Sequence, residues 1–470
     1  MIGWGYLIGY GYLAVLLGIA ELLSRRTDIN REVMRKVLHC LIGLEWFALY
    51  YCFAETWQIV VIPATFILVN ILSYRFKLFH SVEREQGNHP GTIYYAVAMT
   101  AMSIVTAIRP AWMFPFGVAV ICLSFGDAAA ALCGQYLRPR IAVFDKSLWG
   151  TVACFVFALL AQVALSAIVG MPIRMTNVVA IAAVCAVSEV LCTKGTDNLF
   201  VCLWCMVWAY TLYYSNAWLS TVLMLYVAFV LAVVGYRTAA FTGAAALVTG
   251  LLLSAIGLFG GWFAYLFILC SYAVIYLAEH FVRKSQFKER RKIVQIVENG
   301  LPAVLALVAY YVTKREWLLV VFAVAITQSL TDSFASCMGN AYGGTPVDIL
   351  RHRPVEKGLS GGITWVGTLS GILVSVLSMV VIGLVFGWRW YLVAVALLPF
   401  GGMMLDSLLG ASIQHKEICD VCGTVCECTA HCGRPTLHYR GLKHVSNGLV
   451  NLICNTATTL AACLVLYFIH

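Results

Sequence analysis

The sequence predicts an all-α polytopic integral membrane protein with about 16 transmembrane helices in two halves. Of its 470 residues, 61% are hydrophobic and only 11% are charged, whereas soluble domains are roughly half apolar and about a quarter charged. Apolar stretches of about 17 to 25 residues recur along the chain, and each is long enough to cross a hydrocarbon core of roughly 30 Å as a helix. This composition indicates a chain solvated largely by lipid.

The predicted spans fall into two sets of eight. A short polar break at residues 213–217 separates them, so we predict two domains, 1–216 and 217–470. The first span lacks a small-residue cleavage signature and is expected to be a retained helix. In the first half the spans are expected near residues 3–23, 37–54, 57–74, 92–108, 111–133, 149–170, 176–192 and 199–214. In the second half they are expected near residues 217–234, 242–258, 261–281, 300–312, 317–335, 361–386, 389–411 and 448–469.

The basic residues predict which loops are cytoplasmic. Of the 31 Lys and Arg residues, 26 fall in alternate loops on the side of Arg25, and the other five fall on the opposite side. Because Lys and Arg collect in cytoplasmic loops, the first group of loops is expected in the cytoplasm and both termini outside. This rule and anionic membrane lipids account for the net charge of +9, so nucleic acid is not a predicted partner.

Each half repeats an order of acid, basic loop and glycine-rich helix start. Asp127, at the cytoplasmic end of a predicted span, is followed by Lys146 in Lys-Ser-Leu-Trp-Gly-Thr, and Asp332 is similarly followed by Lys357 in Lys-Gly-Leu-Ser-Gly-Gly. A glycine-rich turn that opens a helix offers free N–H groups to phosphate. A lysine adds positive charge, and an acid can hold Mg²⁺ that bridges phosphate oxygens. The pattern therefore indicates phosphoryl transfer.

Each of these residues also has an ordinary structural interpretation. Glycines in spans commonly serve close helix packing, and Lys or Arg at span ends commonly reach to the interface. An acid at membrane depth is costly, however, and indicates a functional site. The candidates from the repeated pattern are Gly126, Asp127, Gly134, Lys146, Ser147 and Gly150 in the first half, and Asp332, Lys357, Gly358, Gly361 and Gly362 in the second.

Further polar residues are predicted at the same membrane face. Asn447 and Asn451 share one helix face because they are four residues apart. Such a pair commonly joins two helices, but with Asp406 it could complete a Mg²⁺ or phosphate site. The other candidates are Arg35, Lys36, Glu189, Asp197 and Asn198 in the first half and Asn299 in the second.

A cysteine-rich loop near the C-terminus has the soft ligands that zinc prefers. Cys419 and Cys422 are followed by His431 and Cys432, with Cys426 and Cys428 between them. A structural zinc site held by Cys419, Cys422, His431 and Cys432 and an unligated loop are both compatible with this spacing. A catalytic zinc is less favoured, and disulfides are not expected because the loop is predicted to face the reducing cytoplasm.

The first half resembles the dolichol kinase and phytol kinase family of membrane enzymes. The resemblance rests on Gly126-Asp127 through Gly134, then Lys146-Ser147 through Gly150-Thr151, with Arg35-Lys36 and His39, Gly91 through Tyr95, and Glu189 with Asp197-Asn198 in the same order. It implies a CTP-dependent kinase that phosphorylates isoprenoid alcohols or, in some branches, diacylglycerol.

The second half resembles an uncharacterised-domain family that includes the chloroplast phytyl-phosphate kinase. The matching strings include Thr242-Gly243-Ala244, Arg291 with Gln295 and Asn299-Gly300, Thr331-Asp332 through Gly339, Gly358 through Gly362, Asp406 through Ala411, the cysteine loop, and Asn447 with Asn451. The chain departs from this pattern at two positions. Cys337 follows Ser336 where the resemblance implies Glu, and Gly448 follows Asn447 where it implies Asp.

Together the resemblances imply one enzyme for two consecutive phosphorylations, from an isoprenoid alcohol to its monophosphate and then to its diphosphate. They imply CTP as the nucleotide triphosphate donor, Mg²⁺ at Asp127, Asp332 and Asp406, and Lys146 and Lys357 on phosphate groups. The alternatives are a CTP-dependent diacylglycerol kinase, a cytidylyltransferase and a secondary transporter, since duplicated halves with acids in spans also occur in transporters.

Overall fold

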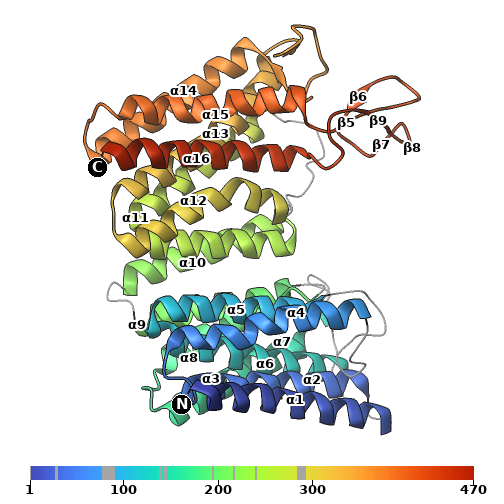
Figure 1. The fold of residues 1–470 in the computed structure, drawn as a ribbon, viewed down its shortest axis with the longest axis vertical. Helices are drawn as coiled ribbons and strands as arrows, with labels where there is room; N and C mark the ends of the chain where they lie inside the picture. The colour runs from blue at the N-terminus through green and yellow to red at the C-terminus, as the bar shows by residue number, and fades with distance from the viewer. Residues whose placement is uncertain are drawn as a thin grey trace. The chain divides into compact units, whose positions relative to one another are not determined.

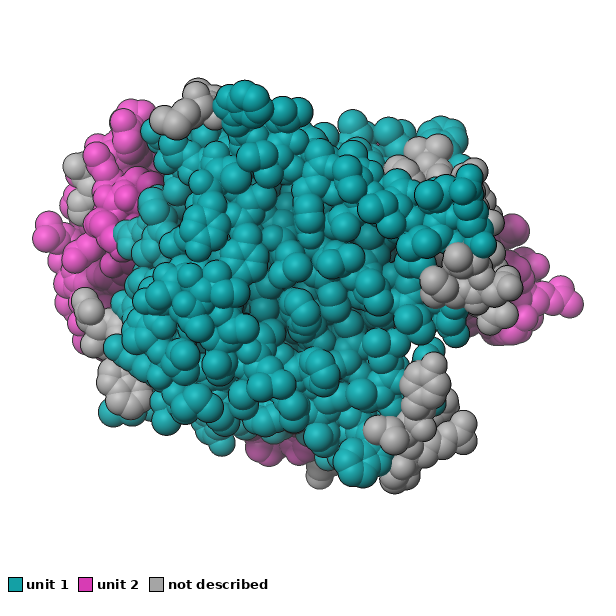
Figure 2. Space-filling model, turned by 90° about the horizontal axis from the view of Figure 1, so that it is seen from below, with its two compact units in different colours: residues 1–254 teal, residues 255–470 magenta. Residues whose placement is uncertain are grey.

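The computed structural model describes residues 2–26, 30–76, 90–136, 140–141, 146–192, 195–214, 218–238, 241–282 and 293–469. Contacts between these residues divide the chain into two compact units, Met1–Ser254 and Ala255–His470 (Figure 2). The division lies beyond the predicted domain boundary at residue 216, and each unit is described separately below.

Helices make up most of the described chain, and the strands are only two to four residues long. The elements of unit 1 are α1 (Ile2–Arg26), α2 (Arg31–Gly43), α3 (Glu45–Tyr51), η1 (Thr56–Val60), α4 (Val61–Phe76), α5 (Gly91–Ile108), η2 (Pro110–Trp112), α6 (Met113–Tyr136), β1 (Arg140–Ile141), β2 (Lys146–Ser147), α7 (Leu148–Val169), α8 (Met175–Leu191), α9 (Asp197–Tyr214) and α10 (Trp218–Arg237). Helix α11 (Gly243–Val282) begins in unit 1, ends in unit 2 and is kinked at Gly261.

Unit 2 continues with a helical bundle and a small region of strands. Helices α14, α15 and α16 run side by side, and the strands β5 to β9 extend beyond the ends of α15 and α16 (Figure 1). The elements are α12 (Ile293–Thr313), α13 (Trp317–Tyr342), β3 (Val347–Asp348), β4 (Gly362–Ile363), α14 (Trp365–Phe386), α15 (Leu392–Ser412), β5 (Lys416–Ile418), β6 (Val425–Cys426), β7 (Ala430–His431), β8 (Arg434–Pro435), β9 (Leu437–Arg440) and α16 (Asn447–Ile469).

One helix forms the protein-buried centre of each unit. The apolar window of α6 is 78% buried and that of α13 is 72% buried, against 17–39% for the other candidate spans. Helix α6 packs on α2, α7 and α9, and α13 packs on α12, α14, α15 and α16. Since these two helices meet protein rather than lipid on most sides, they can carry a polar group at the least cost. They are the helices that bear Asp127 and Asp332.

The predicted all-α membrane fold is confirmed, but the predicted number of about 16 spans is not. Among the described helices, twelve are long and apolar enough to cross a membrane, and α8 is a shorter apolar helix. Two predicted spans, 242–258 and 261–281, lie on α11, where the kink at Gly261 falls between them. The predicted span 37–54 is interrupted at Leu44, which separates α2 from α3.

Candidate functional site

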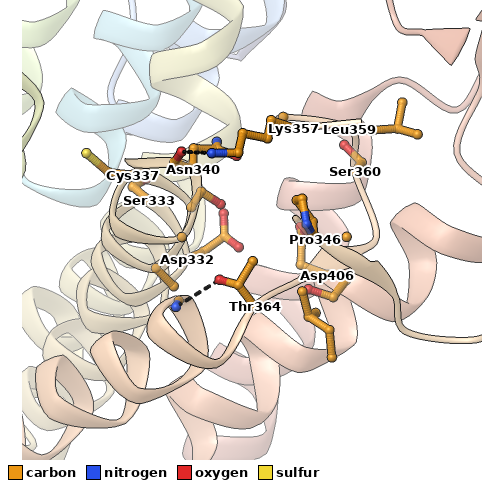
Figure 3. A pocket seen from close by; sticks show the side chains of 18 of the residues that line it. Asp332, Ser333, Cys337, Asn340, Pro346, Lys357, Leu359, Ser360, Thr364 and Asp406 are labelled. Carbon is orange, nitrogen blue, oxygen red and sulfur yellow. Dashed lines mark hydrogen bonds between the residues drawn. The ribbon is translucent and has the colours of Figure 1, made fainter. Parts of the chain in front are cut away.

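A cavity of about 790 Å³ opens in unit 2 between α13, the loop that follows it, α15 and the start of α16 (Figure 3). Residues predicted from scattered parts of the sequence line it together. They are Asp332, Lys357, Gly358, Gly361, Gly362, Asp406, Asn447 and Asn451.

Four acids line this cavity. Asp332 of α13 and Asp406 of α15 face it from two packed helices (Figure 3), and Glu279 and Glu427 also line it. Within the described residues neither Asp332 nor Asp406 forms an ion pair, and the buried Oδ2 of Asp406 has no hydrogen-bond partner there. Two acids close enough to repel each other are stabilised by a cation between them. Carboxylate oxygens suit Mg²⁺, so Asp332 and Asp406 fit the metal role predicted for them.

Both predicted acids lie further from the C-terminal ends of the central helices than expected. Asp127 precedes the last residue of α6 by nine residues, and Asp332 precedes the last residue of α13 by ten, which is about 14 to 15 Å along a helix. The helices continue past residues 133 and 335, where the predicted spans end. In unit 2 the loop after α13 returns alongside the last turns of that helix. The cavity therefore extends from Asp332 to the glycine-rich segment.

The glycine-rich segment that lines the cavity depends on its glycines. Gly358 and Gly361 have φ angles of +84° and +86°, a region that disfavours residues with a side chain. A Cβ at Gly361 would also lie 2.5 Å from the backbone nitrogen of Ala411. Lys357 Nζ donates to the carbonyl of Asn340 at 3.4 Å across the mouth of the cavity. Backbone N–H groups and a lysine therefore border the same space as the two acids.

Within the described residues, four side chains hydrogen-bond to Ser360 in the middle of this segment. The Ser360 N–H donates to Glu427 Oε1 at 2.9 Å, and its hydroxyl donates to Asn447 Oδ1 at 3.2 Å. Gln414 Nε2 donates to the Ser360 hydroxyl at 2.9 Å, and Lys416 Nζ donates to its carbonyl. The segment is thus held in place from the cysteine-rich loop and from α16.

The sequence interpretation missed Glu427, Gln414 and Lys416 as parts of this site. Glu427 stands between Cys426 and Cys428, where the neighbouring cysteines indicate a metal site, and Lys416 is one of the basic residues in the loops that are predicted to be cytoplasmic. Burial, followed by repulsion from Arg440, lowers the pKa of Lys416 to about 8. No local pattern shows that these residues fold back onto Ser360.

The other residues singled out in the second half lie partly inside and partly outside the cavity. Asn299 does not line the cavity, and its carbonyl accepts from Asn455 Nδ2 and Ser329 Oγ, both at 3.2 Å. Arg291 lies outside the described residues. Cys337, at the first departure from the family pattern, lines the cavity.

The second departure, Gly448, is explained by a neighbouring acid. A side chain at position 448 would collide with the carboxylate of Glu298, which α12 directs onto the start of α16. An acid therefore occupies the space beside Asn447 although the chain has none at position 448.

In unit 1 the predicted acids are paired with lysines. Asp127 forms a buried ion pair with Lys36 of α2, and His39 Nε2 lies 4.0 Å from the same carboxylate. Lys146 pairs with Glu189 of α8 and also donates to the Glu189 carbonyl at 2.6 Å. Burial opposes the charge of Lys146, but the Glu189 carboxylate outweighs burial and raises the pKa of the lysine.

The glycines of unit 1 allow close contact between α6 and α7. A Cβ at Gly150 would lie 2.7 Å from the Ala130 carbonyl, one at Gly134 would lie 3.5 Å from Ser147 Cβ, and one at Gly126 would lie 3.1 Å from Cys154 Sγ. These contacts match the packing interpretation of the three glycines. The Ser147 side chain caps α7 by accepting from the Gly150 N–H.

The remaining unit 1 candidates lie around the same helix ends. Arg35 pairs with Glu32 on its own helix and is partly exposed. Asn198 Nδ2 donates to the Gly91 carbonyl at 2.9 Å, and Asp197 accepts from the Asn198 N–H. The charge of Asp197 acts on Lys146, so Asp197 lies near the Lys146–Glu189 pair.

The cysteine-rich loop gathers four metal-binding side chains. The Sγ atoms of Cys419, Cys422 and Cys432 and a ring nitrogen of His431 all lie within 4.8 Å of one another. Three thiols and one imidazole form a donor set that suits tetrahedral Zn²⁺. These are the four residues that the spacing predicted.

Comparison with known proteins relates the chain to membrane proteins. A phytol kinase of Synechocystis sp. is 27% identical over 201 residues, which cover 40% of this chain and 83% of that protein. An uncharacterized membrane protein of Methanocaldococcus jannaschii is 29% identical over 163 residues, covering 33% of this chain and 68% of that protein. No solved structure matches. The family model described as "Integral membrane protein DUF92" matches residues 219–459, just over half of the chain, and the chain therefore belongs to this family of multi-pass membrane proteins.

Proposed function

We propose that this protein is a membrane lipid kinase that phosphorylates an isoprenoid alcohol to its monophosphate and then to its diphosphate, with CTP as the donor. The observation that carries the proposal is the unit 2 cavity. There, two unpaired carboxylates, a glycine-rich segment and a lysine border one space. Phosphoryl transfer needs positioning and charge neutralisation above all, and this combination of groups supplies both.

In the proposed second step, Asp332 and Asp406 hold Mg²⁺, which when bound neutralises charge on the phosphates. The N–H groups of Gly358 and Gly361 and the Lys357 ammonium orient the same phosphates, since the N–H groups of Leu359, Ser360 and Gly362 already donate to Glu356, Glu427 and Leu359. The acceptor of this step is itself anionic, which gives the Lys357 ammonium in the cavity lining a second role. Arg351 is less suited to this role because it bonds to Asp348 and to the carbonyl of Ala411.

The proposed first step is assigned to residues 1–216 because this half carries the motifs that resemble the dolichol and phytol kinase family, together with the paired charges of unit 1. The acceptor alcohol carries no charge, so the only negative charge that this site must neutralise is that of the nucleotide. Lys36 and Lys146 are held by acids at rest, and a bound nucleotide offers phosphate oxygens as a second partner for either lysine. Asp127, once released from Lys36, is available to Mg²⁺.

The test is product analysis with purified protein in detergent. Farnesol or geranylgeraniol is supplied with Mg²⁺ and with CTP or ATP labelled at the γ-phosphate, alongside Asp127→Asn and Asp332→Asn. We expect a labelled monophosphate followed by a diphosphate. Asp127→Asn should block both products, and Asp332→Asn should stop at the monophosphate. Given the monophosphate, Asp127→Asn should still form the diphosphate.

Other outcomes identify other functions. Label on diacylglycerol instead of the prenol indicates a diacylglycerol kinase, and cytidine attached to the lipid indicates a cytidylyltransferase. If a well-folded wild-type protein labels no lipid with any nucleotide, the kinase proposal fails.

A further inference from the structure

The cysteine-rich loop is joined directly to the wall of the cavity. Glu427 lies between Cys422 and His431 in the sequence, and its carboxylate accepts the N–H of Ser360 at 2.9 Å. Glu427 also lines the cavity itself. A change in the conformation of the loop would therefore alter the glycine-rich segment through the Glu427 side chain.

Protein packing alone does little to hold this loop. No residue from 420 to 435 is buried, and only Cys419 at its start is. Its strands β6, β7 and β8 are two residues long. A segment with so little apolar burial does not offset the conformational entropy lost on ordering, and small modules of this kind are commonly folded by a metal ion.

We propose that Zn²⁺ bound by Cys419, Cys422, His431 and Cys432 folds this loop and thereby fixes Glu427 against Ser360, which holds the glycine-rich segment in its phosphate-binding shape. Binding releases the thiol protons to solvent and forms three Zn–S bonds and one Zn–N bond, with no redox change. Zinc has a positioning role here, and Mg²⁺ at Asp332 and Asp406 is a separate site. The phosphate-binding role of the segment rests on the function proposed above, whereas metal binding and loop order can be tested without turnover.

The first experiment measures metal content and amide hydrogen exchange on the purified full chain in detergent. We expect one zinc per chain, and replacement by Co²⁺ should give the absorption bands of a tetrahedral thiolate site. Removing zinc with a chelator should raise exchange at the amides of residues 358–363 about tenfold, as expected when a hydrogen bond to a charged group is lost. Adding Zn²⁺ back should restore protection.

Variants separate the metal from the link to Ser360. Cys422→Ser should lose zinc and protection of residues 358–363, whereas the control Cys428→Ser, an exposed cysteine outside the four ligands, should keep both. Glu427→Ala should keep zinc and lose the protection. A wild-type protein without zinc, a chelated protein with unchanged exchange at residues 358–363, or normal exchange in Glu427→Ala would each overturn the proposal.

Discussion

At the scale of single residues, the two units differ in how the negative charge of their buried carboxylates is neutralised. In unit 1 the buried carboxylates of Asp127 and Glu189 are neutralised by lysines. In unit 2 Asp332 and Asp406 share a cavity with no such partner in the described part of the chain. A buried acid without a countercharge is costly, so unit 2 has the stronger requirement for an added cation.

Replacing an acid of the unit 2 cavity should reduce activity strongly but should not reduce the stability of the protein. Asp406→Asn should slow conversion of the monophosphate to the diphosphate by about a hundredfold or more, since one group that stabilises developing charge is removed. Without Mg²⁺ the same variant should melt at the same or a higher temperature than wild type, because repulsion with Asp332 is relieved. Glu356→Gln, an exposed acid outside the cavity lining, is the control for both the turnover assay and the melting curve.

The Lys36–Asp127 pair should behave in the opposite way. Lys36→Ala leaves a buried charge unpaired and should lower the free energy of unfolding by about 3 kcal/mol. The double variant Lys36→Ala/Asp127→Asn should recover much of that loss in a double-mutant cycle in detergent. Arg35→Ala is the matched control, and it should cost less than about 1 kcal/mol because its partner Glu32 is also partly exposed. Equal losses for the two single variants would contradict the paired-charge interpretation.

Lys416 should give the protein a pH-dependent stability above neutrality. Its pKa in the folded protein is lowered from 10.5 to about 8, so between these values the unfolded chain binds more protons than the folded one. The free energy of unfolding contributed by this group therefore rises with pH from about 8 to 10.5. Unfolding of wild type and Lys416→Met, followed across this range, should show the wild type gaining stability relative to the variant. A constant difference would contradict the assignment.

At the scale of elements, the central helices and the loops that follow them set the geometry of each site. Helix α13 supplies Asp332, and the chain then leaves the helix, passes Lys357 and returns along β4 beside the same helix. The return requires backbone turns at Gly358 and Gly361, and Thr364 then caps α14 by accepting from the Gly367 N–H at 3.1 Å.

Alanine substitutions at two glycines of this loop would distinguish the effect of backbone strain from that of a steric collision. Gly358→Ala introduces only the strain of a positive φ, roughly 1 kcal/mol, because nothing lies within 4 Å of its Cβ position. Gly361→Ala adds a collision with Ala411 and should displace the loop. We expect Gly358→Ala to retain most diphosphate formation and Gly361→Ala to lose about a hundredfold or more, as measured by turnover of the monophosphate. Similar losses for both would point to strain alone.

At the scale of the whole molecule, the sequence predicted the fold class and several residues that line the unit 2 cavity. Hydropathy predicts helices because each span must satisfy its own backbone hydrogen bonds in lipid. Asp127, Asp332 and Asp406 could be predicted as site residues because a charged residue within an apolar span is costly and therefore indicates function. Tertiary contacts such as Lys36 with Asp127, or Glu427 with Ser360, join residues far apart in sequence and leave no local pattern. The predicted boundary between the spans 242–258 and 261–281 coincides with Gly261, whose non-helical backbone divides α11.

The contact between Glu298 and Gly448 has a consequence for exchanging residues between relatives. The negative charge at the start of α16 is carried by Glu298 of a neighbouring helix, and its carboxylate occupies the space that a side chain at position 448 would need. Gly448→Asp alone would force two carboxylates into one space, whereas Gly448→Asp with Glu298→Gly would move the charge from α12 to α16 without adding to it. Gly448→Asp is therefore expected to be better tolerated together with Glu298→Gly than alone.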